Sequence, residues 1–140
     1  MSKDWVKDIN KMHAKFGVHD WVKKELDLPE DWRKLHKFMS FRLDFLKEEL
    51  NETIKAYEEK NAEEVVDGLI DLCVVAIGTL DAFGVDAYKA WDEVHNANMA
   101  KEPGVKESRP NPLGLPDLIK PEGWVGPRHN DNTGNITDSL

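Results

Sequence analysis

Two aspartates open a long apolar run in the segment Asp67-Gly68-Leu69-Ile70-Asp71-Leu72-Cys73-Val74-Val75-Ala76-Ile77-Gly78-Thr79-Leu80. An apolar run of this density predicts a buried element, yet Asp71 lies at its head and Asp67 lies one helical turn earlier. Burying two unpaired carboxylates costs several kcal/mol each, so we expect a cationic group to meet them. A metal ion is the natural candidate.

Length, charge and cysteine content limit the class of protein. A chain of 140 residues suits one domain that buries its own core. Its formal charge of −8 argues against binding to nucleic acid or an anionic membrane, because both favour a basic patch. The single cysteine, Cys73, predicts a small core residue and a reducing compartment. The charged start and the lack of a ~20-residue apolar span predict a soluble, cytoplasmic protein.

Apolar residues at three- and four-residue steps predict four helices. The first covers residues 5–16 and stops at Gly17, and residues 18–30 add a helical turn. The second helix is long, from about residue 29 to about residue 60. The third begins at the N-cap Asn61, where Glu64 completes a capping-box pattern, and ends at Phe83-Gly84. The fourth begins at Asp86 and ends near Asn98 or Met99.

The composition changes after the fourth helix. Six of the seven prolines lie between Pro103 and Pro127, which predicts an extended arm or coil that packs on a surface. The polar residues from Asn130 onward are predicted to be frayed. No segment alternates apolar and polar residues as a strand does. We therefore expect an all-α fold, with a four-helix bundle at residues 1–102 and a non-helical, proline-rich C-terminal arm at residues 103–140.

Acidic residues cluster on one side of two consecutive helices. Glu48, Glu49 and Glu52 span roughly 100° of arc on the second helix, and Asp67 and Asp71 follow on the third. The short connection near residue 60 requires an antiparallel hairpin in which facing residue numbers sum to about 120. Glu49 then faces Asp71, and Glu52 faces Asp67 or its neighbour Gly68, where a glycine permits a close approach.

Four carboxylates at one level of a hairpin form an oxygen-rich site suited to Mg²⁺ or Mn²⁺. The predicted metal ligands are Glu49, Glu52, Asp67 and Asp71. Glu48 is a further ligand or a base. A di-iron carboxylate bundle is disfavoured, because it requires two Glu-x-x-His units and the chain offers only Asp92-x-x-His95.

The pattern Glu48-Glu49-x-x-Glu52 before an acidic helix resembles the all-α nucleoside triphosphate pyrophosphohydrolases. These include MazG-like enzymes, dimeric dUTPases and phosphoribosyl-ATP pyrophosphatase-like proteins. The likeness runs from about Leu35 to Lys101, and the ending Asn-Met-x-Lys is similar to the phage-encoded branch. The family's second helix usually carries Glu-x-x-Asp. Glu64-x-x-Asp67 satisfies this literally, whereas the apolar context favours Asp71 as the final aspartate, so whether Glu64 or Asp67 completes the metal shell stays open.

The resemblance implies hydrolysis of a (d)NTP between its α and β phosphates to (d)NMP and pyrophosphate, in nucleotide-pool control, with Mg²⁺ or Mn²⁺. It also implies Glu48 or Glu49 as the base that activates water, and Asn98 and Lys101 as contacts of the phosphates. Two alternatives stay open: a phosphoribosyl-ATP pyrophosphatase-like activity and a non-enzymatic binding module of the same fold. Aromatic residues are candidates for stacking on a base, although core packing is the better interpretation for Trp5, Trp21, Trp32 and Phe38.

The third helix also bears on assembly. It is apolar nearly all round from Leu69 to Leu80, which is more surface than one partner helix covers. We therefore expect a homodimer or homotetramer, as the resemblance also implies.

Overall fold

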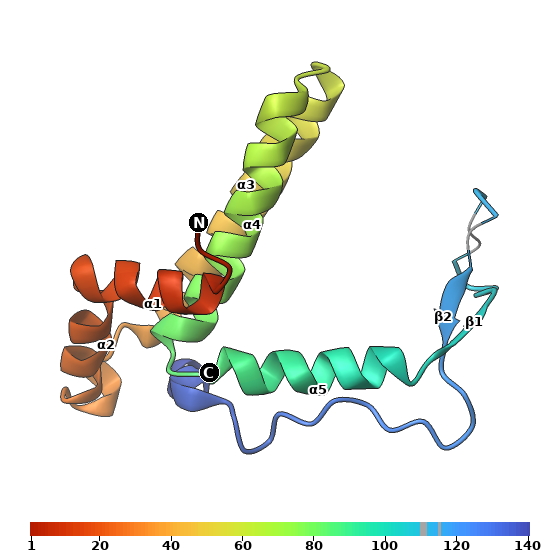
Figure 1. Ribbon diagram of the computed structural model, residues 1–140. Coiled ribbons are helices and arrows are strands. Elements are labelled where there is room, and N and C mark those ends of the chain that lie inside the picture. Colours follow the sequence, from red (N-terminus) through yellow and green to blue (C-terminus); the bar gives the residue numbers. More distant parts are fainter. Residues whose placement is uncertain (110–111, 115) are drawn as a thin grey trace. The chain divides into compact units, whose positions relative to one another are not determined.

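Residues 1–109, 112–114 and 116–140 are described by a computed structural model, which is mostly helical (Figure 1). The contacts divide the chain into two compact units. The first unit consists of residues 1–87 and 133–140, and the second of residues 88–132. The high helix content confirms the all-α expectation, whereas the division at residue 102 stays a prediction.

The first unit contains α1 (Trp5–Lys15), α2 (Val18–Leu26), the 3-10 helix η1 (Glu30–Trp32), α3 (Leu35–Glu58), α4 (Ala62–Ala82) and the 3-10 helix η2 (Gly134–Ser139). The Asp4 side chain caps α1 by accepting a hydrogen bond from the Lys7 backbone N–H at 2.9 Å. Gly17 adopts φ +80°, which lets the chain turn from α1 directly into α2. The first helix and its glycine stop are confirmed, and the turn expected after them is a full helix.

The long helix α3 begins at Leu35 rather than near Pro29. The residues between them form η1 and an extended link, in which Arg33 bonds to carbonyl groups at and just after the end of α2. Arg33 donates from Nε to the Leu28 carbonyl and from Nη2 to the Leu26 carbonyl, both at 3.0 Å. The predicted start is therefore wrong by more than a helical turn.

A tight turn joins α3 to α4 (Figure 1). Lys60 adopts the left-handed region at φ +59°, and the Asn61 N–H donates back to the Ala56 carbonyl at 2.9 Å, which closes α3 with a Schellman motif. The Asn61 side chain accepts a hydrogen bond from the Glu64 backbone N–H at 3.2 Å and caps α4. The predicted N-cap is confirmed.

Close contacts fix the register of α3 against α4. A Cβ atom built on Gly68 would lie 3.1 Å from the Cβ of Thr53 and closer still to the hydroxyl, so only glycine fits opposite Thr53. Towards the other end of the hairpin, Arg42 Nε donates to Thr79 Oγ1 at 3.0 Å. Both pairs have residue numbers that sum to about 120, as an antiparallel hairpin requires.

The core of the first unit gathers where α2, α3 and the end of α4 meet. Its fully buried residues include Leu35 and Phe83. The Phe38 ring lies 5.0 Å from the ring of Trp21 and 5.5 Å from that of Phe83, measured between centroids. Trp21 and Phe38 therefore contribute to packing. Trp5 and Trp32 are more than half exposed, so core packing is the wrong interpretation for these two.

The C-terminal residues return to this core. The Asn135 N–H donates to the Phe83 carbonyl at 2.6 Å, Ile136 packs against the core, and Ser139 is buried. The prediction of a frayed end from Asn130 onward is wrong, because one apolar residue anchors an otherwise polar segment. The arm is also not wholly non-helical, since η2 lies in it.

The second unit contains most of α5 (Ala87–Met99) and the antiparallel strands β1 (Glu102–Gly104) and β2 (Asp117–Ile119). The expectation of no strand is wrong here, because three-residue strands are too short to show alternation. Trp124 Nε1 donates to the Ala97 carbonyl at 2.8 Å and ties the segment after β2 to α5. Leu115 of the predicted arm lies outside the described residues. None of the described helices combines the length and hydropathy of a membrane span.

Gly68→Ala is expected to destabilise the fold by ~1–3 kcal/mol, although alanine is the better helix former. The added methyl group would collide with Thr53 and push α4 away from α3. Urea denaturation measures the loss. The double variant Gly68→Ala/Thr53→Ala lacks the hydroxyl and should recover part of it. A single variant as stable as the wild type would contradict the close approach of the two helices.

Candidate functional site

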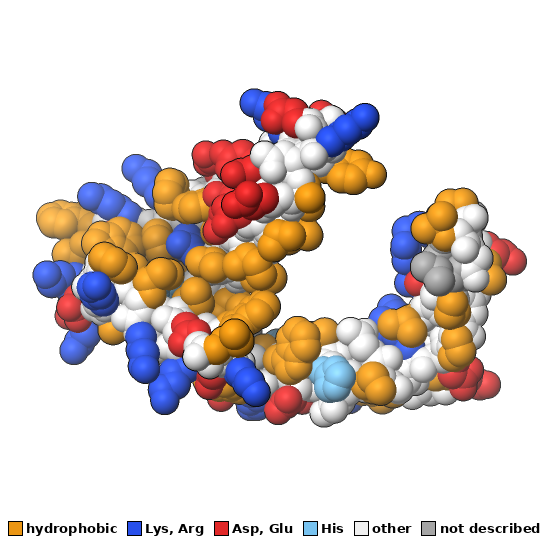
Figure 2. All heavy atoms as spheres, turned by 45° about the horizontal axis from the view of Figure 1, so that its top comes forward, with side chains coloured by type: hydrophobic (Ala, Val, Ile, Leu, Met, Phe, Trp, Pro, Cys, Tyr) orange, Lys and Arg blue, Asp and Glu red, His pale blue; other side chains and the backbone are white. Residues whose placement is uncertain are grey.

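The predicted acidic residues lie on the two helices of the hairpin. Glu48, Glu49 and Glu52 belong to α3, and Asp67 and Asp71 belong to α4. Glu49 and Asp71 are half-buried and the other three are exposed. The expectation that apolar neighbours bury Asp67 is therefore wrong, because those neighbours are themselves exposed in the single chain. Figure 2 shows acidic side chains gathered beside apolar ones over this hairpin.

The pKa of Glu49 shows that these carboxylates lie near one another. The pKa of Glu49 is raised above its ordinary value, first by partial burial and then by the negative charges of Asp71, Glu52, Glu48 and Asp67. The hairpin thus brings the other four predicted residues around Glu49. Their role as metal ligands stays a prediction.

The donor atoms suit a hard divalent cation. In the described part of the chain, no Lys or Arg forms an ion pair with any of these five carboxylates. Mg²⁺ or Mn²⁺ prefers oxygen ligands and would offset the repulsion that raises the pKa of Glu49. Among the described residues, no three of these carboxylates have oxygens that all lie within 4.8 Å of one another.

The remaining predicted residues have other contacts. Glu64 is exposed, and it takes part in the helix cap through its backbone N–H, which donates to the side chain of Asn61. Asn98 is exposed near the end of α5. Lys101 Nζ lies 5.3 Å from the centre of the Trp124 ring in a cation–π contact. Asn98 and Lys101 belong to the second unit, and their contact with phosphate stays a prediction.

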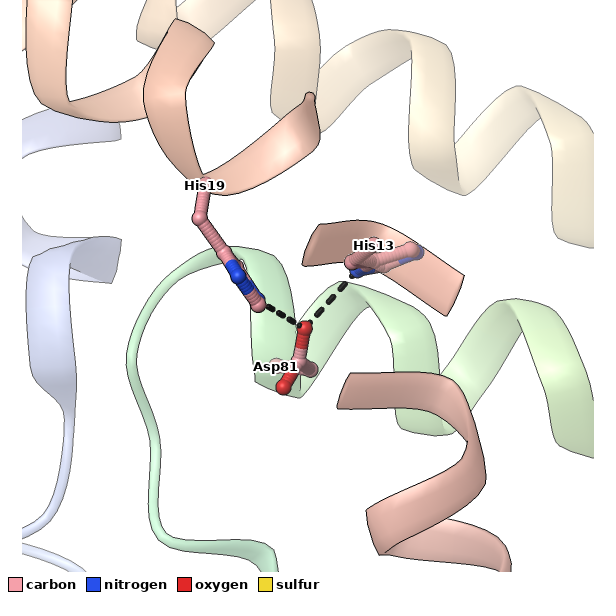
Figure 3. A group of neighbouring side chains, drawn as sticks. All are labelled: His13, His19 and Asp81. Atoms are coloured by element: carbon pink, nitrogen blue, oxygen red, sulfur yellow. Dashed lines mark hydrogen bonds and ion pairs between the residues drawn. The ribbon is translucent and has the colours of Figure 1, made fainter. Parts of the chain in front are cut away.

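A second polar group links α1 and α2 to the end of α4. His13 and His19 point toward the same carboxylate, that of Asp81 (Figure 3). His13 Nδ1 lies 2.8 Å and His19 Nε2 lies 2.7 Å from Asp81 Oδ2. Asn10 Nδ2 donates to Asp81 Oδ1 at 2.8 Å. The side chains of His13 and Asp81 are almost fully buried, whereas 34% of the His19 side chain is exposed.

Burial and hydrogen bonding set the charge of this group. Burial lowers the pKa of His13, and its contact with Asp81 offsets this only in part. Burial by itself raises the pKa of Asp81, but hydrogen bonds from Asn10, His19 and His13 outweigh it and hold the pKa below its ordinary value. At neutral pH an ionised carboxylate therefore faces a neutral His13.

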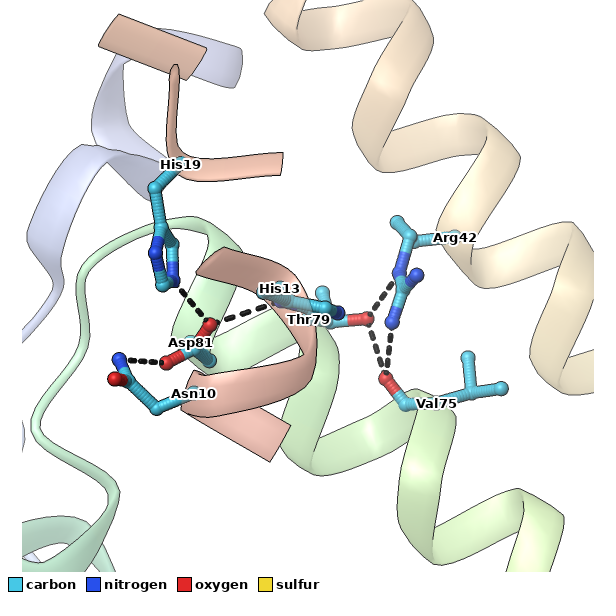
Figure 4. A network of polar contacts seen from close by, with 7 residues as sticks. All are labelled: Asn10, His13, His19, Arg42, Val75, Thr79 and Asp81. Carbon is cyan, nitrogen blue, oxygen red and sulfur yellow. Dashed lines mark hydrogen bonds and ion pairs between the residues drawn. The ribbon is translucent and has the colours of Figure 1, made fainter. Parts of the chain in front are cut away.

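Arg42 lies on the other side of the His13 ring and joins α3 to α4 (Figure 4). Its Nε donates to Thr79 Oγ1 at 3.0 Å, and its Nη2 donates to the Val75 carbonyl at 2.9 Å. The Thr79 hydroxyl donates to the same carbonyl at 2.7 Å. The half-buried guanidinium thus has its partners within the hairpin.

Sequence reasoning missed the His13, His19 and Asp81 group. The signal present was a histidine among the apolar residues of the first helix, followed by a second histidine just beyond Gly17. Asp81 lies more than 60 positions further along, so only the fold connects it to them.

One comparison with known proteins finds a family match that spans the whole α3–α4 hairpin. A family model described as phosphoribosyl-ATP pyrophosphohydrolase (PRA-PH) matches residues 21–98, more than half of the chain. The match includes all five acidic residues and ends at Asn98. It fits the all-α pyrophosphohydrolase superfamily that the residues resemble, and pyrophosphohydrolases of this family typically use divalent metals. No curated protein matches the chain.

Asp71→Asn is expected to leave the stability of the metal-free protein unchanged or to raise it, because it removes one of the charges that repel Glu49. The pKa of Glu49 should fall toward its ordinary value. Thermal melting in the presence of a chelator measures stability, and an NMR titration follows Glu49. The exposed Glu58, near the end of α3, supplies the control Glu58→Gln. If Asp71→Asn cost a few kcal/mol, Asp71 would instead have a structural cationic partner.

Proposed function

The chain belongs to the phosphoribosyl-ATP pyrophosphohydrolase family and is a pyrophosphohydrolase of nucleotide substrates, and on this premise we propose that it cleaves a (d)NTP between the α and β phosphates. The products are the nucleoside monophosphate and pyrophosphate. The proposed role is nucleotide-pool control in the cytoplasm by a MazG-like enzyme of the phage type. We also propose that the fold is that of a four-helix, MazG-like bundle followed by a proline-rich C-terminal arm.

One observation carries the proposal, namely the grouping of four carboxylates around Glu49 on the α3–α4 hairpin. A triphosphate is strongly anionic, and so is this surface. The two attract each other only when divalent cations lie between them. The grouping therefore supports a metal-dependent reaction on a phosphate-bearing substrate and gives little support to direct phosphate binding.

Four residues would hold Mg²⁺ or Mn²⁺, and these are Glu49, Glu52, Asp67 and Asp71. A divalent ion held there would neutralise phosphate oxygens and would help to activate water as the nucleophile. The hairpin supplies ligands from two helices at one level, because Gly68 lets α4 approach α3 closely there. Asp67 rather than Glu64 is the proposed fourth ligand, because the charge of Asp67 acts on Glu49.

Glu49, or Glu48 beside it, would take the proton from the attacking water. The water oxygen bonds to the α phosphorus, the bond from that phosphorus to the bridging oxygen breaks, and pyrophosphate leaves with the electron pair. Asn98 and Lys101 would contact the phosphates.

The description of the matched family favours a second candidate substrate, phosphoribosyl-ATP. Its reactive bond is also a phosphoanhydride, so the same carboxylates serve either substrate. A non-enzymatic binding module is the third possibility, and it would bind metal and nucleotide without turnover.

We further propose that the protein is a homodimer or homotetramer. Large apolar side chains along the α3–α4 hairpin are 44–75% exposed in the single chain, and these are Phe41, Leu43, Leu50, Ile54, Tyr57, Val66, Leu69 and Ile70. A contiguous apolar surface on a soluble protein usually marks an interface. A second copy of the hairpin would cover this surface.

Incubation with Mg²⁺ or Mn²⁺ should release pyrophosphate and the matching monophosphate from at least one member of a panel of NTPs, dNTPs and phosphoribosyl-ATP. Anion-exchange chromatography identifies both products. Glu49→Gln should lower turnover ~100-fold or more, because it removes a ligand and a candidate base. The control Glu58→Gln should retain full turnover. Release of a nucleoside diphosphate would place the cleaved bond elsewhere, and no turnover of any substrate would favour the binding module.

In sedimentation equilibrium at micromolar concentration, the wild type should have twice or four times the 16.0 kDa mass of the chain. The variant Ile54→Lys/Tyr57→Lys places two charges on exposed apolar positions of α3 and should shift the protein toward the monomer. Glu58→Lys changes the charge of the same helix at a polar position and should leave the assembly intact. A monomeric wild type would contradict the proposed interface.

A further inference from the structure

We propose that His13, His19 and Asp81 bind a divalent transition-metal ion of the zinc type, which fastens α1 and α2 to the end of α4. This site is separate from the acidic residues of the hairpin. It does not depend on the proposed reaction.

Three side chains from three helices converge on one point (Figure 3). The ligand atoms His13 Nδ1, His19 Nε2 and an Asp81 carboxylate oxygen all lie within 4.8 Å of one another, and no other described group of three such residues does this. Around a tetrahedral zinc ion with bonds of about 2.0–2.1 Å, ligand atoms lie roughly 3.3 Å apart. Since both nitrogens are now 2.7–2.8 Å from Asp81 Oδ2, withdrawals of about half an ångström from that oxygen would admit an ion.

The donor types point to the metal. Two imidazole nitrogens and one carboxylate oxygen form the ligand set of three-ligand zinc sites, which leave a fourth position for water. Imidazole suits zinc, copper, nickel and iron, whereas Mg²⁺ prefers oxygen. The two groups on this chain should therefore select different ions.

A further contact holds the carboxylate in place. Asn10 Nδ2 donates to Asp81 Oδ1, so Oδ2 is left to face both histidines (Figure 4). Hydrogen bonds of this kind orient the ligands of metal sites. The nearby cation Arg42 directs its hydrogen bonds to α4, on the side of His13 away from Asp81.

The positions of the two histidines would let a metal ion reach the group and hold α1 and α2 against α4. The His19 side chain is 34% exposed, which opens the group to ions and water, whereas His13 and Asp81 are 6% and 8% exposed. Gly17, at φ +80°, turns α1 into α2 and so brings both histidines to Asp81. Both precede residue 21, where the family match begins, so membership of the family gives them no role.

Calorimetric titration of the metal-free full chain with Zn²⁺ tests the proposal, in buffer that contains excess Mg²⁺ to occupy oxygen-rich sites. We expect one Zn²⁺ per chain and a melting temperature that rises with Zn²⁺ concentration. Co²⁺, used as a spectroscopic probe, should give the strong visible absorption of a four-coordinate ion. His19→Gln should abolish this absorption, and Asn10→Ala should weaken Zn²⁺ binding by about 10-fold or more.

The matched control is His95→Gln, because His95 is an exposed histidine on α5 that takes no part in this group. It should bind Zn²⁺ as the wild type does. We substitute His19 rather than the buried His13, because the fold tolerates a glutamine more easily at a partly exposed position. Thermal melting of His19→Gln without metal checks that the variant is folded. The proposal is overturned if the wild type binds no Zn²⁺, or if folded His19→Gln and Asn10→Ala variants bind it as tightly as the wild type. The group would then be a hydrogen-bonded contact only.

Discussion

The close approach of Gly68 to Thr53 sets the register of α3 against α4, and the other features of the first unit depend on that register. With these two residues opposite each other, Glu49 has the carboxylate of Asp71 among its electrostatic neighbours. In the same register Arg42 reaches the hydroxyl of Thr79. A shift of one residue would rotate one helix by about 100° relative to the other and separate these pairs.

One part of the hairpin therefore favours the stability of the single chain, and another part opposes it. The favourable part lies where α1, α2 and η2 pack on the end of α4, with aromatic rings, a half-buried guanidinium and capped helix ends. The unfavourable part lies further along, where like charges crowd and apolar side chains are exposed. Such an arrangement is typical of functional surfaces, because residues chosen for binding are not placed for stability. Metal and a second copy would offset the two costs.

Local features of the fold followed from the sequence. Asn61, Gly17 and Gly84 end or begin helices through contacts within a few residues, so the chain around them suffices to predict them. The facing carboxylates also followed, because a short turn and a 3.6-residue period fix which positions meet. Features that rest on contacts between distant residues did not. The late start of α3 depends on Arg33, and the ordered C-terminus depends on Ile136.

The sequence predicted that the acidic residues share one hairpin, but it did not predict the environment in which they lie. The apolar run of α4 predicts burial, but hydropathy does not state whether the covering surface comes from the same chain or from another. Asp67 is exposed in the single chain, beside apolar residues that are exposed as well. The pairing of His13 and His19 with Asp81 joins residues more than 60 positions apart, and no short-range sequence pattern indicates it.

We propose that the hairpin carboxylates, and not the histidine group, hold the ion of the reaction. Paramagnetic broadening of backbone amide signals by substoichiometric Mn²⁺ tests this most directly, because broadening falls steeply with distance from the ion. We expect selective loss of signals around residues 48–52 and 67–71, and retention of that loss in His19→Gln. Broadening centred on residues 13, 19 and 81, or none on the hairpin, would contradict it.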